Sequence, residues 1–146
     1  MMYTQTRHAR FAFMSPNVQV EDRRVALDQI SETVIGCTHR VSNALGAGFL
    51  EKVYENALAI ELRHSGLDVI QQRRIEVRYR QILVGDFIAD IVVEDRVIIE
   101  VKAVRALEHI HYAQCLNYLR GTNLNVCLLV NFGTPRAIVK RIVHKF

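Results

Sequence analysis

The sequence lacks the features that would place the protein in a membrane or outside the cell. Its longest apolar stretches are the size of a β-strand and fall short of the ~18 uncharged residues that a transmembrane helix needs. Within residues 1–17, the apolar segment 11–14 is too short for the core of a secretory signal peptide. We therefore expect neither membrane insertion nor a signal peptide.

Cysteine is also scarce, and its spacing excludes common cysteine sites. Cys37, Cys115 and Cys127 are odd in number, and none belongs to a CxxC pair. A disulfide framework or a cysteine-based metal site is therefore not expected. Reduced, buried thiols in a cytoplasmic protein fit this pattern.

The composition is that of one globular domain. The chain has 146 residues, of which 50% are hydrophobic and 23% are charged, and this length suits a single core. Lys and Arg outnumber Asp and Glu by 19 to 15, a net charge of +4, which permits a nucleic-acid partner without requiring one. We expect a flexible N-terminal arm at residues 1–20 and one domain at residues 21–146.

Hydrophobic periodicity predicts an α/β fold. Apolar residues recur in steps of three and four along 27–45 and again from about residue 50 to the stop at Ser65 and Gly66, which indicates two helices. Strands are expected at 69–79, 82–93, 97–101, 126–130 and 137–143, with a helix at 107–119. The expected architecture is a central mixed β-sheet flanked by helices.

The two strands joined by the charged turn at residues 94–96 contain the most informative pattern. With a three-residue turn, Asp90 lies opposite Glu100, and both share a face with Lys102. In this register the second face is wholly apolar, whereas a slip of one residue would bury the two carboxylates separately. The predicted faces are Ile88, Asp90, Val92, Ile98, Glu100 and Lys102 on one side, and Phe87, Ala89, Ile91, Val93, Val97, Ile99 and Val101 on the other.

Two carboxylates whose Cβ atoms are about 5 Å apart on neighbouring strands repel each other unless a proton or a cation lies between them. Their hard oxygen atoms favour Mg²⁺ or Mn²⁺, and Lys102 adds a positive charge nearby. This chemistry is that of metal-assisted phosphodiester hydrolysis. The alternative is a solvated sheet surface on which Asp90 pairs with Lys102 or Arg96 and Glu100 is merely exposed.

Several motifs in order resemble a known family. Residues 48–54, GFLEKVY, match the pattern that names the GxxExxY proteins, and Asp90 with Glu100, Val101 and Lys102 matches the metal-site signature of the PD-(D/E)XK nuclease superfamily. Residues 111–119 resemble the H-x-x-Q-x-x-x-Y helix of the family, and residues 129–133 resemble its strand end. The resemblance implies a restriction-endonuclease-like fold.

The resemblance also implies roles for individual residues. Asp90 and Glu100 would be metal ligands together with the Val101 carbonyl, Lys102 would be the catalytic lysine, and Glu51 would be an additional acid near the metal. Ala89 stands where the superfamily pattern has proline, which weakens the motif only slightly.

Other candidate residues have plausible structural alternatives. Glu51 would also be favoured in a first helical turn by the helix dipole. His111, Gln114 and Tyr118 share one helix face. This face is either a solvated stripe or a support for the site, in which Gln114 assists catalysis and His111 and Tyr118 contact substrate. Arg78 and Arg80, with Arg73 and Arg74, form a basic rim that either binds phosphates or is simply solvated.

The resulting hypothesis is a Mg²⁺- or Mn²⁺-dependent nuclease acting on DNA, with RNA as the less favoured substrate. The alternatives are a non-catalytic module that retains a nuclease fold and binds nucleic acid or another partner, and a small interaction domain. Nothing in the sequence indicates the oligomeric state.

Overall fold

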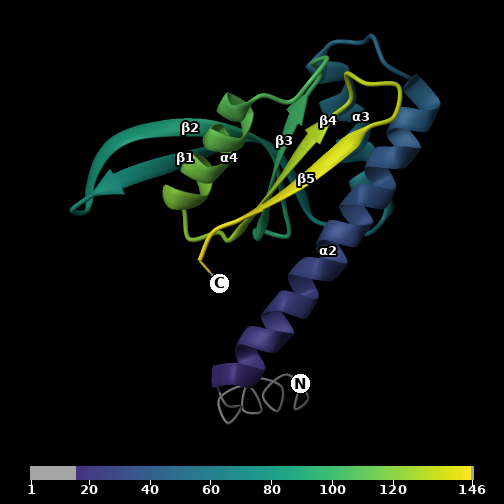
Figure 1. Ribbon diagram of the computed structural model, residues 1–146. Helices are drawn as coiled ribbons and strands as arrows, with labels where there is room; N and C mark the ends of the chain where they lie inside the picture. The colour runs from purple at the N-terminus through teal and green to yellow at the C-terminus, as the bar shows by residue number, and fades with distance from the viewer. Residues whose placement is uncertain (1–15, 146) are drawn as a thin grey trace.

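A computed structural model of the chain describes residues 16–145 (Figure 1). Two helices precede a five-stranded sheet, and a further helix connects its third and fourth strands, as the hydrophobic periodicity predicts. The elements are α2 (Pro16–Leu45), α3 (Glu51–His64), β1 (Val69–Tyr79), β2 (Ile82–Val93), β3 (Val97–Lys102), α4 (His109–Arg120), β4 (Val126–Asn131) and β5 (Ile138–Val143). Within residues 16–145, no helix is long and apolar enough to cross a membrane.

Helix α2 begins earlier than expected. Pro16 occupies its first turn, where a missing N–H leaves no hydrogen bond unmade. Residues 16–20, which we assigned to a flexible arm, are therefore helical, and the rest of that arm, residues 1–15, lies outside the described residues. The buried stripe of α2 starts only at Leu27, so its first turns extend beyond the sheet (Figure 1).

The sheet is mixed, as expected, with strand order β1-β2-β3-β4-β5. The neighbouring strands pair antiparallel except β3 and β4, which are parallel because the connection through α4 crosses over the sheet. Strand β4 is buried along its whole length, which explains its uninterrupted run of apolar residues.

Each face of the sheet packs against its own helices. Helices α2 and α3 cover one face, where Val34, Tyr54 and Leu58 meet Ile99 and other strand residues. Helix α4 covers the opposite face, where Cys115 and Leu119 pack against residues of β2, β3 and β4 (Figure 1). All three cysteines are free and buried, as expected.

The face assignment of β2 was wrong for its outer half. Ile91 and Val93 pack toward α2 and α3 as predicted, but Phe87 and Ala89 pack with Val92 against α4. Ile88, which was expected to share a face with Asp90 and Val92, is 54% exposed. On the neighbouring strand, Gln72 lies between the paired residues Gln71 and Arg73 and has a left-handed backbone with φ of 53°. The alternation of faces in β1 is therefore also broken at the level of Asp90.

The outer end of the β1–β2 hairpin extends away from the rest of the molecule (Figure 1). Arg80 and Gln81 form its turn, and both have positive φ, as a tight two-residue hairpin turn requires. A register shift next to Arg78 marks a β-bulge near this end. Residues 78–86 are exposed, so this segment contributes little to the core.

Candidate active site

Asp90 and Glu100 lie where β2 and β3 separate, and we call this place, with Lys102, the fork. The strands pair through Ile91 with Ile99 and continue to Val93 with Val97, which confirms the register inferred from the three-residue turn. One step further along this register, Asp90 faces Glu100. Asp90 makes no further ladder pair with β3, and its carboxylate Oδ2 instead accepts the backbone N–H of Val101 at 2.8 Å.

Glu100 is a buried carboxylate with an unmet hydrogen-bonding requirement. Its residue is 5% exposed, which contradicts the alternative of a solvent-exposed glutamate. Burial, followed by the charge of Asp90, raises the pKa of Glu100 to about 8. Among residues 16–145, no side chain or backbone group forms a hydrogen bond with its buried Oε2. Such a group is expensive to leave unpaired.

Asp90 is perturbed in the same direction. Burial raises its pKa most, and the charges of Glu55 and Glu51 add to this effect. The Val101 N–H and the positive charge of Lys102 lower the pKa in part. Two neighbouring carboxyl groups that both resist ionisation favour a cation or a proton between them.

Lys102 lies against this pair. Its Nζ is 3.6 Å from Glu100 Oε1, and its side chain is 16% exposed. The Lys102 carbonyl accepts the Phe132 N–H at 2.8 Å, which ties the end of β3 to the end of β4. The lysine is therefore held at the fork rather than extending into solvent.

The segment after Lys102 is held in place by the end of β4, which belongs to the motif at residues 129–133. Asn131 is fully buried; its Oδ1 accepts the Val104 and Gly133 N–H groups, and its Nδ2 donates to the Val104 carbonyl. A Cβ on Gly133 would lie 2.1 Å from the Val104 carbonyl oxygen. The close approach of the backbone at Gly133 to the backbone at Val104 therefore requires glycine at position 133, and the asparagine at position 131 supplies the hydrogen bonds between the two segments.

Two acids come from α3. Glu51 is exposed in the first turn, as the helix-dipole argument allows. Glu55, one turn later, is 3% exposed and was missed by the sequence analysis. Its carboxylate accepts hydrogen bonds from Lys52, Gln71 and Gln72. An acid within the buried stripe of a helix, directly after the motif tyrosine, was the signal that could have identified it.

Tyr54 and the glycines before it shape the entry to α3. Gly46 and Gly48 have φ of 69° and 119°, so the turn needs glycine. The Tyr54 hydroxyl donates to the Gly46 carbonyl at 2.5 Å and accepts the Phe49 N–H at 3.2 Å. Its ring stacks on Phe132 at 4.6 Å, which links the α3 motif to the strand end beside Lys102.

Helix α4 brings Gln114 and Tyr118 toward the carboxylates. Gln114 Nε2 donates to the Tyr118 hydroxyl at 2.5 Å, and the Tyr118 ring stacks on Phe87 at 4.1 Å. Burial, followed by the charge of Glu100, raises the pKa of Tyr118 to about 12. His111 has a structural partner: its Nδ1 accepts the Glu108 N–H at 2.9 Å, which caps the helix.

Of the predicted basic rim, Arg73 and Arg74 pair with Ala89 and Ile88, next to Asp90, and form ion pairs with Asp95 and Asp86. Arg78 and Arg80 lie apart from the two carboxylates. Arg78 pairs with Glu76 at 2.7 Å, and Arg80 lies over the Tyr79 ring at 5.7 Å. Both are at the hairpin tip, about 20 Å or more along the strands from Asp90 at ~3.3 Å per residue. The structure therefore does not bring them together with the carboxylates.

The residues at the fork fit a divalent cation. Within residues 16–145, His, Cys, Asp and Glu side chains form no group of three or more that could hold a metal. A metal site here would consequently combine the two carboxylates with a backbone carbonyl. The unpartnered Glu100 Oε2 and the raised pKa values of both carboxylates are what such a site would show without its cation.

The mixed sheet, its helices and the acidic fork define an α/β fold of the nuclease type. A model of the PD-(D/E)XK nuclease superfamily matches residues 28–142. The chain belongs to this superfamily. The narrower assignment to the GxxExxY family stays a prediction from the motifs.

A comparison with solved structures supports the fold. The crystal structure of SSO0001 matches with a TM-score of 0.51 at 17% sequence identity, and the match covers 89% of this chain and 61% of that one. At this identity the likeness supports the fold alone. No curated protein matches the chain.

Proposed function

We propose that the protein is a metal-dependent nuclease that hydrolyses phosphodiester bonds in nucleic acid, with DNA favoured over RNA. The observation that carries the proposal is the arrangement at the fork. Glu100 is buried and has an oxygen without a hydrogen-bond partner among the described residues, Asp90 lies opposite it, and Lys102 Nζ is 3.6 Å from Glu100 Oε1. Membership of the nuclease superfamily supports this assignment.

Asp90, Glu100 and the Val101 carbonyl would hold Mg²⁺ or Mn²⁺. When bound, such an ion polarises a phosphoryl oxygen and makes a coordinated water more acidic. Lys102, whose Nζ lies 3.6 Å from Glu100 Oε1, would donate to a phosphate oxygen or orient the attacking water. Gln114, whose amide donates to the Tyr118 hydroxyl, would organise water on the α4 side.

Glu51 and Glu55 have different roles in this proposal. Glu51 is exposed and so is available to a metal-bound water. Glu55 already accepts hydrogen bonds from Lys52, Gln71 and Gln72, which suits a positioning residue that joins α3 to β1. We therefore expect Glu51→Gln to lower the cleavage rate with little change in stability, whereas Glu55→Gln lowers the free energy of unfolding as well.

Substrate contacts are proposed for Tyr118, His111, Arg78 and Arg80. For Tyr118, the proposal is supported by its raised pKa, to which, after burial, the charges of Glu100 and Asp90 contribute. Arg78 and Arg80 would contact phosphates only at a distance from the reacting bond, on a long substrate. Their replacement should weaken binding and reduce its salt dependence rather than alter the chemical step.

The test is cleavage of plasmid and single-stranded DNA and of RNA by the purified full-length protein with Mg²⁺ or Mn²⁺. Asp90→Asn is expected to abolish both Mn²⁺ binding measured by calorimetry and cleavage. Lys102→Met is expected to keep Mn²⁺ binding but to lower the cleavage rate about 100-fold or more. Arg136→Gln, an exposed substitution, serves as the matched control.

Absence of metal-dependent cleavage, or equal cleavage by Asp90→Asn, would refute the nuclease proposal. Salt-sensitive nucleic-acid binding that needs no metal and survives Glu100→Ala would instead identify a non-cleaving binding module.

A further inference from the structure

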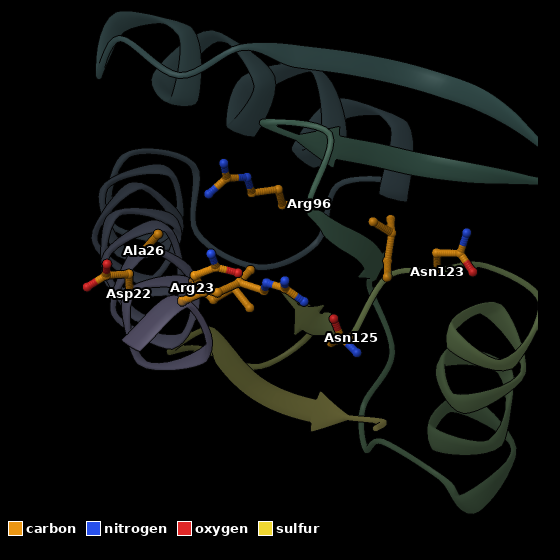
Figure 2. A pocket seen from close by; sticks show the side chains of 9 residues that line it. Asp22, Arg23, Ala26, Arg96, Asn123 and Asn125 are labelled. Carbon is orange, nitrogen blue, oxygen red and sulfur yellow. The ribbon is translucent and has the colours of Figure 1, made fainter. Parts of the chain in front are cut away.

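A cavity lies at the other end of β3. A pocket of about 510 Å³ opens between the N-terminal part of α2, the turn before β3 and the segment that leads into β4 (Figure 2). Arg96, in that turn, and Lys102 are at opposite ends of the strand, about 20 Å apart at ~3.3 Å per residue. The pocket is therefore separate from the carboxylate fork.

Two arginines line this pocket from different elements. Figure 2 shows Arg23 extending from α2 toward Asn125, while Arg96 extends from the turn before β3 toward α2. Within residues 16–145, neither forms an ion pair with a carboxylate, although Arg40, Arg73, Arg74, Arg78 and Arg141 each do. Asp22 also lines the pocket, so the arginines exceed the acid by one positive charge.

The rest of the lining suits a ring with hydrogen-bonding edges. Asn123 and Asn125 supply side-chain amides, and Leu124 supplies apolar surface. Asn125 Nδ2 donates to the His144 carbonyl at 3.0 Å and to the Lys145 carbonyl, which fixes the orientation of that amide and leaves its Oδ1 as the group open to a ligand. The Asn123 amide offers both a donor and an acceptor to a base edge, the Asn125 Oδ1 offers an acceptor, and an apolar side chain can cover a base face.

We propose that this pocket binds a nucleoside phosphate, with Arg23 and Arg96 on the phosphate and Asn123 and Asn125 on the base. Guanidinium groups match the geometry and charge of phosphate oxygens. The volume of about 510 Å³ lies in the usual range for sites that enclose a small ligand. The nucleotide is either free or part of a strand, because both present the same chemistry.

The full-length protein can be titrated with adenosine monophosphate, the tetranucleotide dT4, adenosine and inorganic phosphate. Affinity is measured by calorimetry, and the side-chain amide signals of Asn123 and Asn125 are followed by NMR. Arg23→Gln and Arg96→Gln are each expected to weaken binding about tenfold or more, with Arg136→Gln as the matched control. Asp90→Asn should bind as the original protein does, which separates this site from the nuclease proposal.

Arginine-dependent binding of adenosine monophosphate supports a free nucleotide as the ligand, and the same dependence for dT4 alone supports a nucleotide within a strand. The proposal fails if neither probe saturates, if both arginine variants bind like the control, or if adenosine or inorganic phosphate binds as tightly as the nucleotide.

Discussion

Replacing Glu100 by glutamine is expected to remove a pH-dependent loss of stability from the protein in EDTA. The pKa of Glu100 rises from 4.5 to about 8 on folding, chiefly because the group is buried and secondly because Asp90 is near. Between these values the folded chain holds a proton that the unfolded chain has released. The contribution of Glu100 to stability is therefore fully present below pH 4.5, falls as the pH rises toward 8, and is constant above that range.

The size of the effect follows from the pKa difference. One pKa unit corresponds to ~1.4 kcal/mol, so the free energy of unfolding falls by about 5 kcal/mol over the whole range and by about 2 kcal/mol between roughly pH 6 and pH 8. The Glu100 side chain is only 6% exposed, so screening by solvent does little to reduce this value.

The assay is urea unfolding followed by circular dichroism from about pH 5 to pH 9, in EDTA, for the original protein and Glu100→Gln. Their difference reports Glu100 together with its coupling to Asp90, since the histidines and other distant groups titrate in the same way in both proteins. Glu76→Gln, at an exposed carboxylate of the hairpin, is the control. If the stability curves of the original protein and Glu100→Gln stay parallel across this range, the account of a buried, protonated Glu100 is incorrect.

The remaining predictions concern packing next to the fork. Gly133→Ala should lower the free energy of unfolding by about 3 kcal/mol, because its Cβ would meet the Val104 carbonyl at 2.1 Å; Gly85→Ala, with no atom within 4 Å of its Cβ, is the control in the same urea assay. Tyr54→Phe should cost about 1–3 kcal/mol by thermal unfolding, because it removes two hydrogen bonds to the preceding loop while keeping the stack on Phe132. An unchanged melting temperature would show that those bonds contribute nothing.

Much of this arrangement could be predicted from the sequence, because it depends on local patterns. The three-residue turn and the alternation of side chains were enough to predict that Asp90 lies opposite Glu100 on the neighbouring strand. The apolar run of β4 likewise indicated a strand that is buried on both faces. These inferences hold wherever strands alternate regularly, since the side-chain period of two then fixes the faces.

The errors arise where a distant contact decides the outcome. Gln72 is not a glycine, so nothing in its residue type indicated its left-handed backbone. Nothing in the alternation of β2 indicated that Phe87 packs toward α4. The burial of Glu55 likewise depends on Gln71 and Gln72 reaching across from β1 to α3. Helical periodicity describes one helix at a time and carries no information about such partners.

The exposed hairpin tip has a practical consequence. Residues 78–86 lie beyond the point where the strands change faces, and no core residue is among them. Insertions and deletions there should be absorbed without disturbing the two packed layers. A fluorophore attached at the tip should therefore leave the fold intact and lie next to Arg78 and Arg80, where it would report their proposed contact with nucleic acid. The length of this segment can change without altering the two carboxylates.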